Sequence, residues 1–224
     1  MTYRKIKPLV LKALQADELE AGLRFIRGIP PRRVVNPLFS LLYHGRPLVR
    51  WRAVSAMGET VSLLAREDLE GARVVMRRLM WNLNDESGGI GWGSPEAMGE
   101  IMARHRGLAE EYATILISYL NPCGNFLEHE GLQHGVLWAL GRVAGAHPSL
   151  LQGVLPLILP FLSSCDPELR ALALWSGRAL PHGDRQIRKH LEAFLNDQAQ
   201  VTLYLDGRLQ TTTIAGLAGP PYRP

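Results

Sequence analysis

The sequence predicts an all-α protein, a right-handed α-solenoid of four to five stacked helix pairs that ends in a small C-terminal β-hairpin. Three observations support this fold class. A short motif recurs at intervals near 41 residues, apolar residues around it recur at helical spacing, and the composition becomes strand-like after residue 200. We therefore expect a helical repeat domain over residues 1–199 and a hairpin with a tail over residues 200–224.

The repeated motif is Ala-Met-Gly-Glu at residues 56–59, and it returns at residues 97–100. Related copies follow as Ala-Leu-Gly-Arg at residues 139–142 and, more degenerate, as Trp-Ser-Gly-Arg at residues 175–178. Small residues at the first and third positions allow neighbouring helices to approach closely, so these positions should be buried. The predicted buried positions are Ala56, Gly58, Ala97, Gly99, Ala139 and Gly141.

Helix boundaries can be predicted from capping residues and prolines. Asp166-Pro167 and Ser94-Pro95 each place a capping residue before a proline in the first helical turn. Partner helices are expected over residues 68–83, 108–120 and 149–162, and the two prolines within 149–162 should bend the last of them.

The C-terminal segment has the pattern of a β-hairpin. Residues 201–205 and 208–214 are rich in Val, Thr, Tyr and Ile, which favour strands. Asp206-Gly207 between them suits the positive φ angles of a type I′ turn. A single hairpin is only marginally stable, so it must pack on the last helices or on another chain. The residues from Gly219 onward are expected to form a loose tail.

A family resemblance accompanies these patterns. Residues 46–59, Arg-Pro-Leu-Val-Arg-Trp-Arg-Ala-Val-Ser-Ala-Met-Gly-Glu, resemble the consensus of HEAT-like repeats of the phycobilin-lyase type, and residues 166–173 resemble its start. The resemblance covers most of residues 15–195 and implies a HEAT-like fold, but such repeats serve scaffolds, lyases and hydroxylases alike. The chain also resembles an uncharacterised bacterial group of short HEAT-repeat proteins that shares residues 81–100, and that resemblance implies no activity.

Charge is distributed unevenly along the chain. The net charge of +4 combines 11 Lys and Arg against 3 Asp and Glu in residues 1–52 with 14 against 18 in the rest. Arginines that could face an anionic partner, or form an ordinary solvated helix surface, are Arg24, Arg27, Arg32, Arg33, Arg46, Arg50 and Arg52. Two cysteines and the absence of an apolar run of about 20 residues indicate a cytoplasmic protein without a membrane span or secretory signal.

The most unusual segment runs from residue 81 to residue 96. It carries four glycines, two tryptophans and adjacent polar acceptors, and it leads into a predicted helix N-terminus. Glycines allow close approach of the backbone to a ligand, and carboxylates beside indole rings suit a cation. The predicted ligand-binding residues are Trp81, Asn84, Asp85, Glu86, Ser87, Gly88, Gly89, Trp92 and Glu96. The alternative is a structural loop whose side chains cap their own backbone.

A second cluster, Glu128-His129-Glu130 with His134, has the four-residue spacing that two metal ligands on one helix face would need. The HEAT-repeat hydroxylase with two irons uses such His-Glu pairs, but only one pair occurs here and it lies upstream of the register in that enzyme. We therefore predict no metal, no cofactor and no catalytic residue. His134 occupies the repeat position of Trp51 and Trp92, and Trp138 and Trp175 fall one helical turn later in their own copies. These large residues at helical spacing are predicted to be core residues and not a ligand platform.

The leading functional hypothesis is a non-catalytic scaffold that binds a protein or peptide, because solenoids present extended surfaces. The first alternative is nucleic-acid binding, similar to HEAT-like alkylation-repair glycosylases, with weak and salt-sensitive affinity through the basic first third. The second alternative is a small-ligand or metal-dependent enzyme centred on Asp85 and Glu86. The sequence favours none of the possible oligomeric states.

Overall fold

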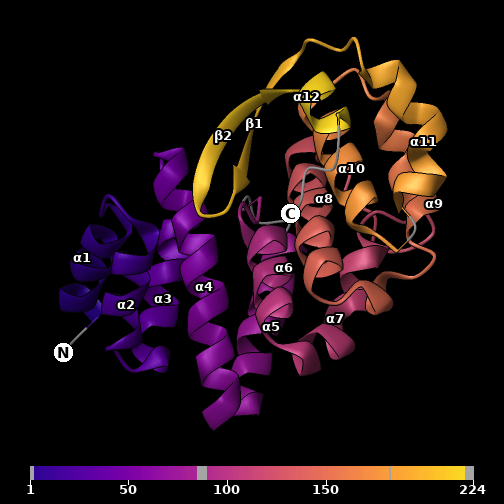
Figure 1. The fold of residues 1–224 in the computed structure, drawn as a ribbon. Coiled ribbons are helices and arrows are strands. Elements are labelled where there is room, and N and C mark those ends of the chain that lie inside the picture. The colour runs from indigo at the N-terminus through magenta and orange to yellow at the C-terminus, as the bar shows by residue number, and fades with distance from the viewer. Residues whose placement is uncertain (1–2, 85–89, 182, 220–224) are drawn as a thin grey trace. The chain divides into compact units, whose positions relative to one another are not determined.

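A computed structural model describes residues 3–84, 90–181 and 183–219. The chain divides into two compact units, Met1–Leu108 and Ala109–Pro224 (Figure 1). The first unit contains α1 (Tyr3–Leu14), α2 (Leu19–Arg27), α3 (Pro31–Leu41), α4 (Pro47–Glu67), α5 (Leu69–Leu83) and α6 (Ser94–Arg104), and α7 (Arg106–Ser118) spans the division. The second unit contains α8 (Glu130–Ala146), the 3-10 turn η1 (Pro148–Leu151), α9 (Leu155–Ile158), η2 (Leu159–Ser163), α10 (Pro167–Ala179), α11 (Gly183–Phe194), β1 (Gln200–Leu205), β2 (Arg208–Thr213) and α12 (Ile214–Ala218).

The repeat motif lies where α4 and α6 pack together in the first unit. Ala56 and Ala97 have no exposed surface, and Gly58 and Gly99 are also buried, as predicted. A Cβ added to Gly58 would lie 2.5 Å from Cγ of Glu100 and 3.0 Å from its carbonyl oxygen. Glycine at this position therefore allows the backbone of α6 to approach α4 more closely than any side chain would permit.

One predicted surface arginine is instead part of the core. Arg52 on α4 is only 5% exposed and donates to the carbonyl oxygens of Leu14 at 3.1 Å and Asp17 at 2.9 Å, and also to that of Ala16. These carbonyls follow the end of α1, where helical hydrogen bonds run out. Arg52 therefore caps α1 and belongs neither to an anion-binding surface nor to a solvated helix face, the two alternatives predicted for it from the sequence.

In the second unit, α8 packs against α10 around two tryptophans. Trp138 is 2% exposed and Trp175 5% exposed, and their stacked rings have centroids 6.4 Å apart, which confirms the prediction that both are core residues. Ala139 and Gly141 are buried beside them, also as predicted.

Helix boundaries agree with the capping prediction at one site and differ at the other. The Asp166 carboxylate caps α10 by accepting from the Glu168 N–H at 2.8 Å, as predicted. At α6, by contrast, the cap is Gly93, and Ser94 is already the first helical residue, completely buried. Between α8 and α10, the single bent helix predicted over residues 149–162 is instead broken into three short segments, η1, α9 and η2.

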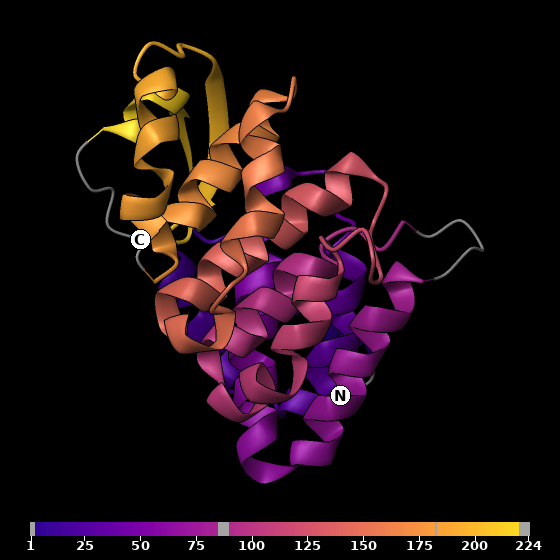
Figure 2. The same ribbon diagram turned by 90° about the vertical axis from the view of Figure 1, so that its right-hand side faces the viewer.

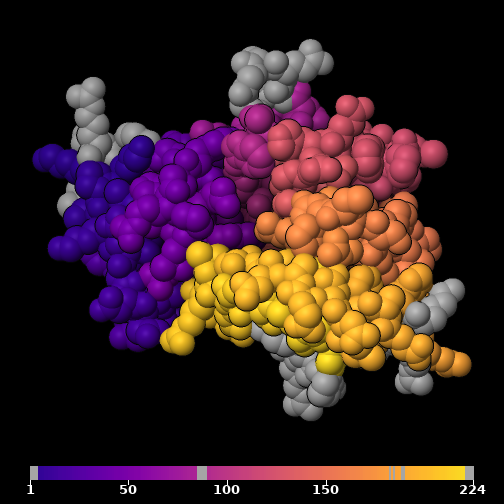
Figure 3. Space-filling model, turned by 90° about the horizontal axis from the view of Figure 1, so that it is seen from above, coloured from indigo at the N-terminus to yellow at the C-terminus, as the bar shows by residue number. Residues whose placement is uncertain are grey.

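The predicted hairpin is present, and its turn has the predicted form. Asp206 and Gly207 have φ angles of 50° and 77°, and β1 pairs antiparallel with β2. The Trp138 indole N–H donates to the Tyr204 carbonyl at 2.9 Å. Figures 2 and 3 show the C-terminal segment lying against the helices of the second unit, where β1 and α12 contact α10. Ile214, which was expected to extend the second strand, instead begins α12.

Candidate interaction face

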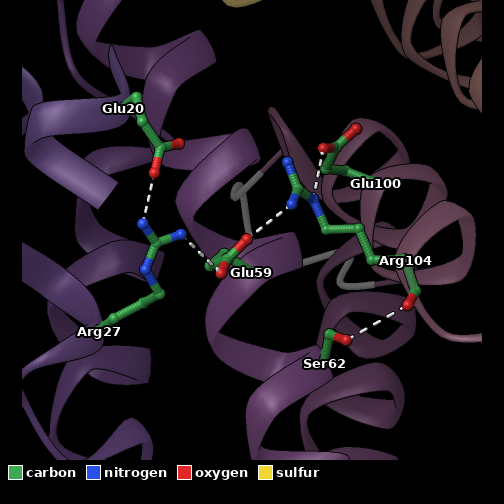
Figure 4. A network of polar contacts seen from close by, with 6 residues as sticks. All are labelled: Glu20, Arg27, Glu59, Ser62, Glu100 and Arg104. Carbon is green, nitrogen blue, oxygen red and sulfur yellow. Dashed lines mark hydrogen bonds and ion pairs between the residues drawn. The ribbon is translucent and has the colours of Figure 1, made fainter. Parts of the chain in front are cut away.

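A chain of five charged side chains connects three neighbouring helices of the first unit (Figure 4). Arg27 on α2 bonds to Glu20 on the same helix and donates to Glu59 on α4 at 3.1 Å. Arg104 on α6 donates to Glu59 at 2.6 Å and to Glu100, one turn earlier, at 2.8 Å. Glu59 therefore accepts from both arginines and joins α2 to α6 through α4.

This network contains three carboxylates and two guanidinium groups, so it carries an excess of negative charge. The side chain of Glu100 is 4% exposed and that of Glu59 17%, whereas the two arginines remain about one-third exposed. The hydrogen bond from Arg27 lowers the pKa of Glu20, which keeps that carboxyl ionised. The network is accordingly a charged surface that is partly screened from water.

The same helices carry tryptophans one repeat apart. Residues four apart lie on one side of a helix. The α4–α6 face, as we name it, consists of Trp51, Ser55 and Glu59 on α4 and of Trp92, Glu96 and Glu100 in and just before α6. Trp51, Trp92 and Glu96 are half-buried. In both repeats a tryptophan thus precedes glutamate in the chain, and Trp92 lies before the left-handed Gly93 that caps α6.

The predicted loop site lies only partly within the described residues. Asp85, Glu86, Ser87, Gly88 and Gly89 lie outside them. At the end of α5, Trp81 is 74% exposed and Asn84 is also exposed. Beyond the undescribed residues, Trp92 and Glu96 belong to the α4–α6 face. Convergence of the whole set on one ligand stays a prediction.

Two glycines of this loop have a conformational reason to be present. Gly91 has a φ of 68°, and a Cβ there would lie 2.6 Å from the Asn82 carbonyl oxygen. Gly93 has a φ of 76° and caps α6. Left-handed backbone favours glycine at both positions, so local packing explains these two glycines without a ligand.

Three of the basic N-terminal residues have partners within the first unit. Arg27 belongs to the charged network, Arg52 caps α1, and Arg32 pairs with Asp68. Arg33 lies on α3, outside the helices that carry the α4–α6 face. These placements reduce the positive charge available to an anionic partner in the first unit.

His134 has an acidic partner on the neighbouring helix. Its Nε2 lies 2.7 Å from Oδ2 of Asp166, the residue that caps α10. Burial alone would raise the pKa of Asp166, but the Glu168 N–H and the His134 ring outweigh it and lower that pKa. Glu130 is exposed at the start of α8, and within the part of the chain that the structure describes, no group of three His, Cys, Asp or Glu could hold a metal ion.

The charged network was missed in the sequence, although one signal for it was present. The residue after the repeat glycine is glutamate in two successive copies, at Glu59 and Glu100. Equivalent positions of stacked repeats are spatial neighbours, so two acids in this register require a cation between them. Arg104 lies four residues after Glu100 and meets that requirement.

Comparisons with known proteins agree with this architecture. Residues 130–176 match the sequence profile of the HEAT-like repeat family. An uncharacterised protein of Archaeoglobus fulgidus is 30% identical over 114 residues, which is 51% of this chain and 58% of that protein. The aligned part thus spans little more than half the length of the relative.

Solved structures give the same fold. An engineered protein matches with a TM-score of 0.51 at 16% identity, over 87% of this chain and 90% of its own. A designed armadillo repeat protein matches with a TM-score of 0.50 at 16% identity, over 94% of this chain and 96% of its own. Another designed armadillo repeat protein, in complex with the peptide (KR)4, matches with a TM-score of 0.50 at 17% identity, over 86% of this chain and 92% of its own. The HEAT- and armadillo-like fold predicted from the sequence is therefore confirmed. Among the described residues, no helix is both long and apolar enough to span a membrane.

Proposed function

We propose that this protein is a non-catalytic, cytoplasmic interaction module whose α4–α6 face binds a basic segment of a protein or peptide partner. The observation that carries the proposal is the repetition of tryptophan and glutamate along α4 and α6, with Glu59 shared between two arginines. A repeated pattern of side chains suits a partner that is itself extended, because each repeat then meets one stretch of the partner.

Charge supports a basic partner. Carboxylates exceed guanidinium groups in the network. An incoming guanidinium or ammonium group can take over one of the bonds that Arg27 or Arg104 makes to Glu59. Trp51 precedes Glu59 and Trp92 precedes Glu96 and Glu100 in the chain, and indole rings suit a cation by stacking. An acidic partner would instead be repelled by the carboxylates of Glu20, Glu59 and Glu100.

The structural comparison adds support of a different kind. One designed armadillo repeat protein of similar fold is described in complex with the peptide (KR)4, a strongly basic ligand. The similarity concerns the fold alone, and the choice of a basic partner here rests on the side chains of the α4–α6 face. The loop between α5 and α6 is part of the proposal, because Trp92 and Glu96 belong both to that face and to the predicted loop site.

Fluorescence anisotropy with a labelled (Lys-Arg)4 peptide tests this function. Glu59→Gln preserves size but removes the charge and one of the two acceptor oxygens that the arginines share, so we expect at least a tenfold loss of affinity, about 1.4 kcal/mol. Glu70→Gln is the matched control, because Glu70 on α5 pairs with Arg77 outside the face and its loss should change affinity less than about twofold.

Two outcomes would contradict the proposal. The first is no measurable binding of basic peptides by the wild-type chain at micromolar concentration. The second is binding that Glu59→Gln and Glu70→Gln weaken equally, because the peptide would then respond only to total charge. Tryptophan fluorescence of each variant, compared with the wild type, shows whether the fold is intact.

A further inference from the structure

A groove in the first unit lies between α3 and α5, apart from the helices that carry the α4–α6 face. It has a volume of about 590 Å3 and is open to solvent. Its walls are formed by Asn36, Phe39, Ser40 and Tyr43 from α3 and its C-terminal end, and by Arg78 and Asn82 from α5. These residues recur at spacings of three or four, so each helix contributes one continuous side of the groove.

Arg78 is held in a fixed orientation at this groove. Its guanidinium carbon lies 3.9 Å from the centre of the Phe39 ring, and Nη1 donates to Oδ1 of Asn36 at 2.5 Å. A ring on one side and an amide on one nitrogen leave further N–H donors of the guanidinium directed elsewhere. Arg78 is therefore oriented in advance, which reduces the entropy that a ligand must overcome on binding.

The bonding of Arg78 differs from that of its neighbours on α5. Arg73 and Arg77 both reach the Glu70 carboxylate, at 3.6 Å and 2.6 Å. For Arg78, no described residue supplies a carboxylate within ion-pair distance, and none of the described residues that line the groove is an acid. The groove consequently presents a positive charge that the described residues do not neutralise.

The other polar groups of the groove suit a peptide main chain. Asn82 offers both an amide donor and an amide acceptor, and Asn36 keeps its NH2 group after accepting from Arg78. The Ser40 hydroxyl donates to the Pro37 carbonyl at 2.7 Å, which leaves its oxygen able to accept. Asparagine amides can bond to the N–H and C=O groups of an extended chain, whatever its sequence.

From this arrangement we propose that the α3–α5 groove is a separate binding site for an acidic peptide segment. One carboxylate of the peptide bonds to the free edge of the Arg78 guanidinium. Its main chain bonds to the amides of Asn36 and Asn82, and a neighbouring apolar side chain rests on the exposed ring of Tyr43. This proposal does not depend on the basic partner of the α4–α6 face, because the two sites share no residue and select opposite charges.

Binding of the full chain to two immobilised peptide libraries tests the site. Both libraries contain random ten-residue peptides with a central pair of fixed residues, Glu-Glu in one and Gln-Gln in the other. We expect selective enrichment from the Glu-Glu library. For the best peptide, measured by calorimetry, replacing both glutamates by glutamine should weaken binding at least about tenfold.

Variants of α5 then locate the site. Arg78→Gln retains a donor for Asn36 but loses the charge, and it should weaken the acidic peptide about tenfold or more. Arg77→Gln, one residue away and outside the groove, is the matched control and should change affinity less than about twofold. Asn82→Ala should weaken the peptide and its Gln-Gln version by the same factor, because the amide contacts only main chain.

Three results would overturn the proposal. One is the absence of any binder in the Glu-Glu library, and another is equal loss of affinity in Arg78→Gln and Arg77→Gln. The third is competition by a single-stranded oligonucleotide that binds more tightly than the peptides and depends on Arg78, which would assign the groove to phosphate instead. A failure of (Lys-Arg)4 binding at the α4–α6 face would leave these measurements unaffected.

Discussion

Adding one methyl group to Gly141 should have the opposite effect to adding it to Gly145, four residues later on the same helix. At Gly141 the new Cβ would lie within 2.5 Å of Cε3 of Trp175 and 2.8 Å of Cη2. At Gly145 no heavy atom lies within 4 Å of the added Cβ. Both changes replace glycine by alanine in α8, so their difference isolates the contact with Trp175.

The expected magnitudes follow from two terms. Alanine favours the helix over glycine by up to about 1 kcal/mol, so Gly145→Ala should stabilise the protein by about 0.5 to 1 kcal/mol. Gly141→Ala gains the same term but forces Trp175 to move, and overpacking of this kind costs about 1 to 3 kcal/mol. Trp175 stacks on Trp138, whose N–H holds the Tyr204 carbonyl, so the displacement also weakens that bond by about 1 kcal/mol. The net expectation is a loss of about 1 to 3 kcal/mol.

Thermal unfolding followed by circular dichroism measures both variants. For a chain of this length, 1 kcal/mol corresponds to about 2 to 4 °C in Tm. Gly141→Ala should therefore melt several degrees below the wild type and Gly145→Ala slightly above it. A Tm of Gly141→Ala equal to or above that of the wild type would refute the close contact between α8 and α10 and the repeat register inferred from it.

Four further measurements check other parts of the structure. Asp166→Ala should cost about 0.5 to 2 kcal/mol at neutral pH through the lost helix cap; because the folded pKa of Asp166 is below its ordinary 3.8, its stabilisation is present above that pH and lost as pH falls further, so urea unfolding should show a flatter acid limb in the variant. Arg52→Met should cost about 1 to 3 kcal/mol in urea unfolding and raise amide exchange after α1, because buried carbonyls lose their donor. Burial raises the pKa of Tyr119 to about 12, so absorbance at the phenolate band should show a tyrosine that titrates well above the ordinary value of 10.0, with stability falling as pH rises above that value. If the loop is a ligand site, the double variant Asp85→Asn with Glu86→Gln should leave Tm nearly unchanged and abolish binding of the (Lys-Arg)4 peptide. A changed Tm with unchanged peptide binding would instead assign the loop to packing.

Much of the fold followed from local rules. The repeat spacing predicted which small residues lie at helix contacts, because equivalent positions of stacked helix pairs meet in space. Asp206-Gly207 predicted the turn through the φ angles that it permits. The prediction that Ser94 caps α6 was wrong, because Gly93 before it adopts the left-handed conformation and takes the cap position. The helix start shifts by one residue, and Ser94 is buried.

The candidate site was harder to predict, because its geometry depends on partners distant in sequence. The two carboxylate oxygens of Glu59 meet Arg27, 32 residues earlier, and Arg104, 45 residues later, and neither distance is a repeat length. Arg52 was assigned to a charged surface because arginine is usually exposed. Its role as a cap depends on the position of the end of α1, which no local pattern reveals.

Because Trp138 donates a hydrogen bond to Tyr204, formation of the hairpin depends on the packing of the helices of the second unit. A two-stranded hairpin has little stability of its own, and the buried side chains of β1, Val201 and Leu203 among them, need a surface to cover. That surface includes α10, and the bond to Trp138 comes from 66 residues earlier in the chain. The hairpin should therefore dock only after α8 and α10 have assembled, late in folding. The time at which the β1 amides that pair with β2 become protected from hydrogen exchange would then mark the completion of folding in the second unit.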